Sequence, residues 1–165
     1  MNQITLARQG DLTPEMREIA RVEKCDAKMV WDGVRLGEIV IMRSQRLSGH
    51  KRIVGIGQGL STKINANIGT SQDRASLALE LEKMRVAIAY GADTIMDLST
   101  GDDIRATRQR IIAESTVPVG TVPVYDVMHA MIAQGKPLDA ATEDDFLRAI
   151  ETHIEDGVDF ITVHC

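Results

Sequence analysis

Residues 62–70 show the most regular alternation of polar and apolar positions in the chain. The polar positions are Lys63, Asn65 and Asn67, and the apolar positions between them are Ile64, Ala66 and Ile68. Strict alternation predicts a short β-strand with two different faces. Amide groups inside a fold are costly unless they are hydrogen-bonded. We therefore expect the polar face of this strand to hold a polar ligand.

After this strand the chain alternates between helical and strand-like patterns. A helix start is predicted at residues 71–73, and the helix continues to Tyr90. Its buried face is expected to carry Leu77, Leu81, Met84 and Ile88. Further strands are predicted at residues 92–98, 117–125 and 158–164, with intervening helices at 104–112, 127–133 and 142–156. This order predicts βαβ units and a parallel sheet.

Helix-capping signals sharpen two parts of this outline. Two helices are predicted within residues 1–50, one starting at Thr13 before Pro14 and the other at Asp26. We interpret residues 1–50 as a helical N-terminal segment, called the preface, with one strand at 38–42. Thr142 and Asp145 resemble a capping box, followed by a helix whose predicted inner positions are Phe146, Leu147, Ile150 and Ile154. The glycines of residues 54–59 are interpreted as a flexible or bulged lead-in to the strand at 63–68, because their spacing differs from that of a phosphate loop.

One residue near the carboxyl end of each predicted strand is a candidate ligand contact. In a (β/α)8 barrel, side chains at these ends share one mouth, where the chemistry takes place. The four candidates, one from each strand–helix unit, are Asn67, Met96, Tyr125 and His164. Taken singly, Met96 could be core filler, Tyr125 a loop packing residue and His164 a strand-end histidine. Taken as a set, they predict a substrate-binding site.

Composition narrows the class of protein. The net charge of −5 and the 3% aromatic content argue against a nucleic-acid-binding surface, and 44% hydrophobic residues suffice for a core. The sequence contains neither a long apolar run nor a secretory signal pattern, so we expect a cytoplasmic protein without a membrane segment. Cys25 and Cys165 form no metal-binding motif by their spacing.

Four ordered motifs closely resemble the phosphomethylpyrimidine synthase family, which includes the paralogous 5-hydroxybenzimidazole synthase. They lie at residues 63–69, 92–101, 119–125 and 157–164. The resemblance implies a (β/α)8 TIM-type barrel, of which residues 51–165 would supply about the first four strand–helix units after the preface at 1–50. It also places the family's substrate contacts on Asn67, Met96, Tyr125 and His164.

The resemblance implies a function as well. Members of this family are radical S-adenosylmethionine enzymes that carry a [4Fe-4S] cluster. They start the rearrangement of 5-aminoimidazole ribonucleotide with a 5′-deoxyadenosyl radical and make the hydroxymethylpyrimidine phosphate of thiamine biosynthesis. Because the cofactor generates the radical, the four contacts would bind and confine the substrate.

The chain departs from the family in two respects. The Cys-x-x-Cys-x-x-x-x-Cys cluster ligands are absent, and the pattern stops at the fourth strand. We therefore expect a fragment that is inactive by itself and that hides its open sheet edge by forming a homodimer. Residues 41–46 also differ from the usual thiamine-type segment, which gives weight to 5-hydroxybenzimidazole synthase, acting on the same substrate for the cobalamin lower ligand.

Two readings from other classes remain open. The chain could be a binding or structural half-barrel without turnover. It could also be a phosphate-binding barrel of the aldolase type, for which Lys63 is the candidate Schiff-base lysine. A structural role for Lys63, paired with a carboxylate, is the simpler interpretation of that residue.

Overall fold

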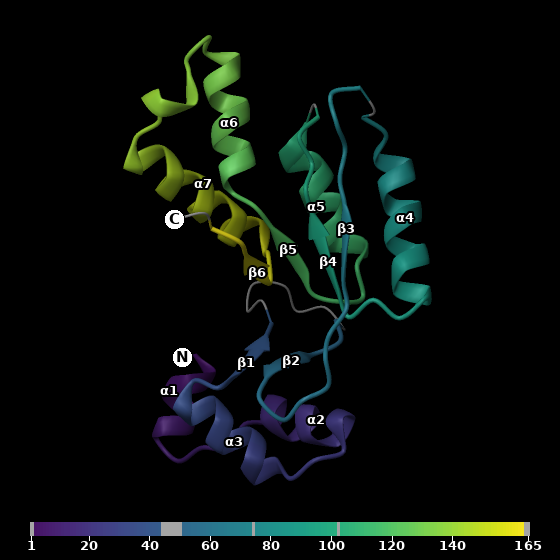
Figure 1. Ribbon diagram of the computed structural model, residues 1–165, viewed down its shortest axis with the longest axis vertical. Coiled ribbons are helices and arrows are strands. Elements are labelled where there is room, and N and C mark those ends of the chain that lie inside the picture. The colour runs from purple at the N-terminus through teal and green to yellow at the C-terminus, as the bar shows by residue number, and fades with distance from the viewer. Residues whose placement is uncertain (1, 44–50, 74, 102, 164–165) are drawn as a thin grey trace. The chain divides into compact units, whose positions relative to one another are not determined.

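The protein folds into two compact units, seen in a computed structural model that describes residues 2–43, 51–73, 75–101 and 103–163 (Figure 1). The N-terminal unit comprises the residues up to Arg43 together with Arg52–Lys63. The sheet unit comprises Lys51 and the residues from Ile64 onward. No helix in the described ranges is long and apolar enough to cross a membrane.

The N-terminal unit contains three helices and a two-stranded sheet. Its elements are α1 (Gln3–Arg8), α2 (Pro14–Glu23), α3 (Ala27–Leu36), β1 (Ile39–Met42) and β2 (Val54–Gly57). Both predicted caps are confirmed: the Thr13 hydroxyl accepts from the amide of Met16, and the Asp26 carboxylate accepts from the amide of Lys28. Each side chain satisfies an amide that the first helical turn leaves without a partner.

The predicted flexible lead-in at residues 54–59 is wrong, because residues 54–57 form β2. This strand pairs with β1 in antiparallel register, with Ile39 opposite Gly57. A Cβ at Gly57 would lie 2.1 Å from the Glu38 carbonyl oxygen, so glycine permits the close approach of the two backbones. Residues 52–63, which the sequence pattern grouped with the following strands, therefore lie with the N-terminal helices.

The sheet unit alternates strands and helices around a four-stranded parallel sheet. Its elements are β3 (Asn65–Ile68), α4 (Leu77–Ala89), β4 (Thr94–Asp97), α5 (Ile104–Glu114), β5 (Val119–Thr121), α6 (Val124–Ala133), the 3-10 turn η1 (Leu138–Ala140), α7 (Glu143–Asp156) and β6 (Phe160–Ile161). The strand order is β3-β4-β5-β6, so each strand lies beside the one before it in the sequence. The predicted mixed α/β class with a parallel sheet is confirmed.

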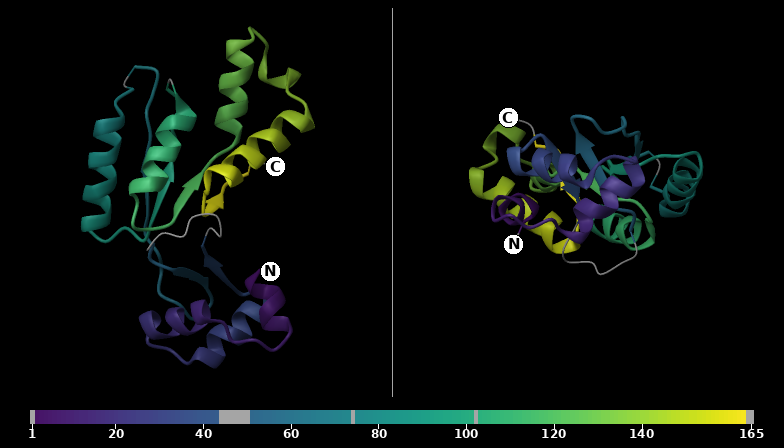
Figure 2. Two further views of the ribbon diagram at one scale, coloured as in Figure 1. Left: turned by 180° about the vertical axis from the view of Figure 1, so that it is seen from behind. Right: turned by 90° about the horizontal axis from the view of Figure 1, so that it is seen from below.

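Helices α4 and α5 lie on the same side of this sheet (Figures 1 and 2). The core between them and the strands is apolar, and it consists of Ile68, Leu81, Met84, Ala92, Ile95, Ile111, Ile112, Val117 and Val119. The predicted buried face of α4 is confirmed, since Leu77 and Ile88 also pack against this cluster. The helical spacing of its leucines and methionine thus fixes how α4 sits on the sheet.

Two predicted boundaries differ from the structure. Lys63 lies outside the strand, which begins at Asn65, and its ammonium pairs with the Glu23 carboxylate of the N-terminal unit at 2.8 Å. Helix α4 begins at Leu77, after the Ser76 side chain caps it, and not at residues 71–73. The carboxylate partner of Lys63 supports the structural interpretation of this amine over a Schiff-base role.

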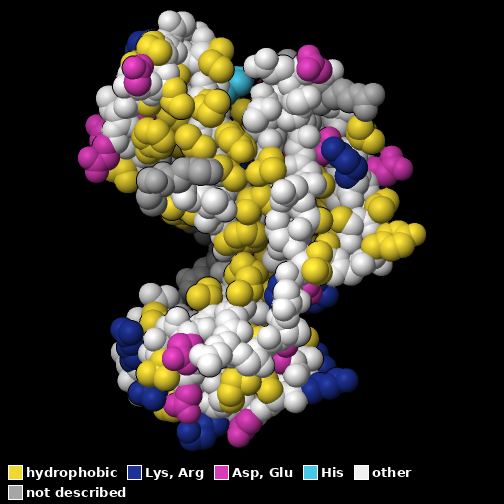
Figure 3. Space-filling view, in the orientation of Figure 1, with side chains coloured by type: hydrophobic (Ala, Val, Ile, Leu, Met, Phe, Trp, Pro, Cys, Tyr) yellow, Lys and Arg dark blue, Asp and Glu magenta, His cyan; other side chains and the backbone are white. Residues whose placement is uncertain are grey.

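The capping box of α7 is confirmed, but the predicted inner face of this helix is wrong. Its buried residues are Ala149 and His153, whereas Phe146, Leu147 and Ile154 are exposed and Ile150 alone of the predicted four is half-buried. The small side chain of Ala149 packs with Val127 and Met131 of α6, and His153 is buried among polar partners described below. Figure 3 shows exposed hydrophobic side chains gathered over the part of the sheet unit that contains α6 and α7.

Gly120 of β5 is the tightest position in the sheet. A Cβ there would lie 2.2 Å from the Phe160 ring. We predict that Gly120→Ala destabilises the protein by about 1–3 kcal/mol, the usual cost of overpacking. Denaturant unfolding measures the loss.

The matched test repeats the substitution in a Phe160→Ala background, where the ring is gone. There Gly120→Ala should cost little, because the effects of residues in contact are not additive. An equal loss of stability in both backgrounds would contradict the close contact.

Candidate functional site

Asn67 and Met96 lie side by side at the carboxyl ends of β3 and β4. The parallel register pairs Asn67 with Met96 and, one step further along each strand, Ile68 with Asp97. Paired residues of neighbouring strands point to the same face of a sheet. Asn67 is exposed and Met96 is half-buried, so an amide and a thioether are available together to a ligand. The structure brings these two predicted site residues together.

The same row continues through Gly120 of β5 to Phe160 of β6. Because Gly120 has no side chain, the Phe160 ring lies over its Cα position. The row thus offers an amide, a thioether and an aromatic ring on one face of the sheet. Phe160 was not singled out from the sequence, although a glycine inside a strand does signal a close approach by another group.

Asn65 braces Asn67 from one layer deeper. Its Nδ2 donates to Asn67 Oδ1 at 2.9 Å, and its Oδ1 accepts from the Thr94 hydroxyl at 2.8 Å. Thr94 is the register partner of Asn65 on β4 and is buried. Because Asn67 accepts this bond with its oxygen, its amino group is turned to donate elsewhere. The polar face predicted from the alternation is therefore satisfied internally at Asn65 and available at Asn67.

Tyr125 does not lie at the end of a strand, as the sequence pattern predicted. Strand β5 ends at Thr121, and Tyr125 lies in the first turn of α6, so the prediction of a strand-end tyrosine is wrong. The reason is Pro123, whose helical backbone angles (φ −56°, ψ −27°) turn the chain into α6. Tyr125 still follows the carboxyl end of β5, and it is half-buried. His164 lies outside the described residues.

The loops after β3 and β4 are held together at the same edge of the sheet. The amide of Gly69 donates to the buried Glu80 carboxylate at 2.7 Å, and the amide of Thr70 donates to Ser99 Oγ at 3.1 Å. The Ser99 hydroxyl in turn donates to Asp97 Oδ1 at 2.6 Å. Burial raises the pKa of Asp97, and the hydrogen bonds from Ser99 oppose that rise. These contacts give the edge that carries Asn67 and Met96 a fixed shape.

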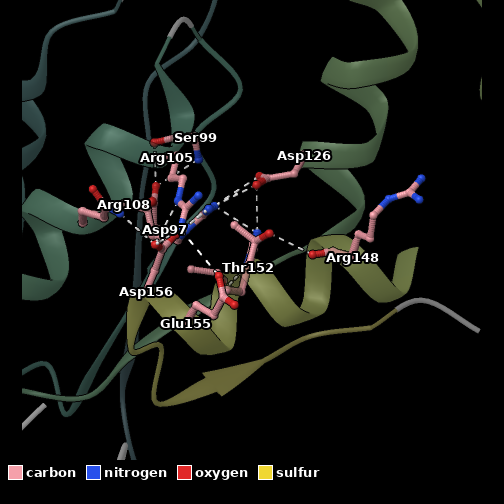
Figure 4. Close-up of polar contacts among 12 residues, drawn as sticks. Asp97, Ser99, Arg105, Arg108, Asp126, Arg148, Thr152, Glu155 and Asp156 are labelled. Atoms are coloured by element: carbon pink, nitrogen blue, oxygen red, sulfur yellow. Dashed lines mark hydrogen bonds and ion pairs between the residues drawn. The ribbon is translucent and has the colours of Figure 1, made fainter. Parts of the chain in front are cut away.

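A buried ionic cluster joins α5, α6 and α7 on the helix side of the sheet (Figure 4). The guanidinium of Arg108 is 1% exposed and contacts Asp126 on α6, at 3.0 Å, and Asp156 on α7, at 2.9 Å. Burial alone would raise the pKa of both carboxyl groups. For Asp126, the hydrogen bond with His153 and the charge of Arg108 outweigh burial and hold the pKa below its usual range.

The pKa of Asp156 is also lowered against the effect of burial, by hydrogen bonds from Gln109, Arg105 and Arg108. The sequence pattern did not reveal this cluster, because its members come from three helices and their polar side chains read as solvent-facing. An arginine in the middle of an otherwise apolar helix face, between Ile104 and Ile111, was the available signal.

The described residues do not fit an iron–sulfur cluster. Within the described ranges, no group of three or more His, Cys, Asp or Glu residues is placed to hold a metal ion. Cys25 is half-buried in the N-terminal unit, and burial and the nearby charge of Glu23 raise the pKa of its thiol. A raised pKa disfavours the thiolate that cluster ligation requires.

Comparison with known proteins identifies the family. Residues 2–165 match the model of the Radical SAM ThiC family. The chain is 46% identical over 166 residues to phosphomethylpyrimidine synthase of Pyrococcus furiosus, and the matched region covers 99% of this chain and 38% of that protein. It is 47% identical over 165 residues to the enzyme of the same name from Syntrophus aciditrophicus, covering 100% of this chain and 38% of that protein.

The phosphomethylpyrimidine synthase of Thermus thermophilus is 46% identical over 164 residues, with the same 38% of its length covered. The chain thus spans well under half the length of the curated relatives it matches. With its family match over nearly every residue, the chain belongs to the Radical SAM ThiC family, a family of radical S-adenosylmethionine enzymes associated with thiamine biosynthesis.

Proposed function

We propose that this chain forms the first substrate-binding portion of a radical S-adenosylmethionine lyase. The reaction is the rearrangement of 5-aminoimidazole ribonucleotide to 4-amino-5-hydroxymethyl-2-methylpyrimidine phosphate in thiamine biosynthesis. The observation that carries the proposal is the in-register pair of Asn67 and Met96 at one strand edge. It occurs in a chain that is 46% identical to a phosphomethylpyrimidine synthase over 99% of its length.

The proposal includes a (β/α)8 barrel. Such a barrel repeats one strand–helix unit eight times, and the four parallel strands of this sheet, in sequential order and joined by helices, have the arrangement of four such units. The chain covers 38% of its relatives, so the remaining strands would come from sequence beyond it. In a closed barrel, the row through Asn67, Met96, Gly120 and Phe160 would face the interior near the mouth.

In this proposal the residues bind and orient the substrate. The Asn67 amide donates a hydrogen bond to the ribonucleotide, and Met96 and Phe160 give it an apolar floor. Tyr125 and His164 contribute a phenol and an imidazole from the third and fourth units. The [4Fe-4S] cluster with S-adenosylmethionine supplies the radical chemistry in the full-length protein, and none of the described residues fits as its ligands.

The alternative product is 5-hydroxybenzimidazole, the precursor of the cobalamin lower ligand. The sequence at residues 41–46 favours it, because this segment departs from the usual thiamine type. The names of the curated relatives favour the pyrimidine. A cytoplasmic location of the protein stays a prediction, whichever of the two products the enzyme makes.

Product analysis separates these functions. We expect the full-length protein, reconstituted anaerobically with iron, sulfide, S-adenosylmethionine and 5-aminoimidazole ribonucleotide, to give the hydroxymethylpyrimidine phosphate by mass spectrometry. A benzimidazole product would instead support the alternative. The 165-residue chain treated in the same way should take up no stoichiometric iron and form neither product, and iron–sulfur incorporation into it would contradict its assignment as an inactive portion.

Substrate affinity tests the strand-edge site. In the full-length protein, Asn67→Ala should weaken binding of 5-aminoimidazole ribonucleotide by about threefold to tenfold, the value of one hydrogen bond, with unchanged cluster content. Asn65→Asp should weaken it too, because a carboxylate cannot donate to Asn67 Oδ1. Calorimetric titration measures both.

The matched control is Gln9→Ala, which removes an exposed amide of the N-terminal unit and should leave affinity unchanged. Wild-type affinity in Asn67→Ala would remove this residue from the site. If Asn67→Ala weakens substrate binding and Asn65→Asp does not, the bracing role of Asn65 is wrong, while the assignment of Asn67 to the site stands.

We further infer that the 165-residue chain dimerises when isolated. Strand β6 ends the described sheet, and hydrophobic residues of α7 in the same unit, among them Leu147 and Ile154, are exposed. An unpaired edge and exposed apolar surface both favour self-association. Size-exclusion chromatography with light scattering should report twice the mass of one chain, and a stable monomer at micromolar concentration would contradict the inference.

A further inference from the structure

The short segment that carries Tyr125 is held at both ends by a single imidazole. His153 of α7 is 1% exposed. Its Nδ1 lies 2.7 Å from the hydroxyl of Thr121, the last residue of β5, and its Nε2 lies 3.1 Å from Asp126 Oδ2 in the first turn of α6. His153 thus connects the residues on either side of Val122–Tyr125.

Arg108 of α5 holds the same turn from another direction. Its Nη1 donates to both carboxylate oxygens of Asp126, at 3.2 and 3.0 Å, and lies 2.9 Å from His153 Nε2. A buried charge that loses its partner is strongly destabilising, so this arrangement has little freedom to vary. We call Thr121, Arg108, Asp126 and His153 the clamp.

The segment between the held ends has few degrees of freedom of its own. Pro123 fixes one backbone angle, and Val122 is buried. The amide of Tyr125 donates to the carbonyl of Val122 at 3.1 Å. Because the clamp anchors Asp126, which directly follows Tyr125, it also fixes the start of α6 and the position of the Tyr125 Cα.

The clamp lies on the opposite side of the sheet from the proposed site. Thr121 follows Gly120 in β5 and pairs with Asp97 and Ile161, whereas Gly120 pairs with Met96 and Phe160. Successive side chains of a strand point to opposite faces. The Thr121 hydroxyl therefore faces the helix layer, and the clamp can influence a ligand on the Asn67–Met96 face only through the residue it positions.

We propose that the clamp residues are positioning residues that fix Tyr125 for substrate binding. This rests on the proposed function, in which Tyr125 contacts 5-aminoimidazole ribonucleotide. A ring on two rotatable bonds follows the backbone that carries it, and small displacements of a binding group are costly in affinity. The clamp acts on substrate affinity and not on the radical chemistry.

Two near-isosteric substitutions loosen the clamp in the full-length protein. Asp126→Asn removes the charge that Arg108 holds, and Thr121→Val removes the hydroxyl that contacts His153. Each should weaken binding of 5-aminoimidazole ribonucleotide by roughly fivefold to tenfold. Asp139→Asn, the same chemical change at an exposed position of η1, is the control and should bind like the wild type.

The discriminating measurement repeats both substitutions in a Tyr125→Ala background. If the clamp acts through Tyr125, neither substitution weakens binding further once the ring is gone. An equal fold-loss in both backgrounds, or no loss in the wild-type background, overturns the proposal. Thermal unfolding verifies folding, and if one of the two variants does not fold, the other decides by the same comparison.

The outcome for Tyr125→Ala separates this inference from the proposed function. Unchanged affinity in Tyr125→Ala overturns the clamp proposal, because there is then no contact to position. The proposed function is judged independently by Asn67→Ala and by the identity of the product.

Discussion

The parallel pairing of β3 with β4 decides what the sheet unit can present to a ligand. Parallel strands bring all their carboxyl ends to one edge, and the register places Asn67 beside Met96 there. A shift of one residue in this register would turn Asn67 to the helix side, because side chains alternate between the two faces. The apolar core under α4 and α5 resists such a shift, since Ile68 and Ile95 would lose their burial.

Hydrogen-bonded networks of polar side chains lie on both sides of the sheet in this unit. On one face, Asn65 uses its amide to connect Thr94 and Asn67. On the other, the guanidinium of Arg108 and the imidazole of His153 join three helices to β5. The network of Arg108 and His153 is buried, and because buried polar groups must be satisfied, it fixes the geometry of the residues it joins. The first network shapes the proposed site directly, and the second defines where α6 begins.

The sequence predicted features that depend on neighbouring residues and missed those that depend on distant ones. The Thr13 and Asp26 caps and the Thr142–Asp145 capping box are local, and all three were predicted correctly. The pairing of β2 with β1 depends on a glycine that meets a backbone from another segment, and alternation alone could not reveal it.

The candidate site was predicted in part. Asn67 and Met96 followed from strand periodicity, and the structure places them together. Tyr125 was assigned to the wrong element, because Pro123 begins a helix where the pattern of valines suggested a longer strand. The buried side of α7 was missed for a related reason: His153 is polar, and the partners that allow its burial lie on β5, α5 and α6.

The proposed binding site of the ribonucleotide is the edge formed by β3 and β4. A crystal structure of the full-length protein with 5-aminoimidazole ribonucleotide bound tests it most directly. We expect the ligand to lie within hydrogen-bonding distance of Asn67 Nδ2 and in van der Waals contact with Met96. A ribonucleotide bound elsewhere, touching neither side chain, would contradict it.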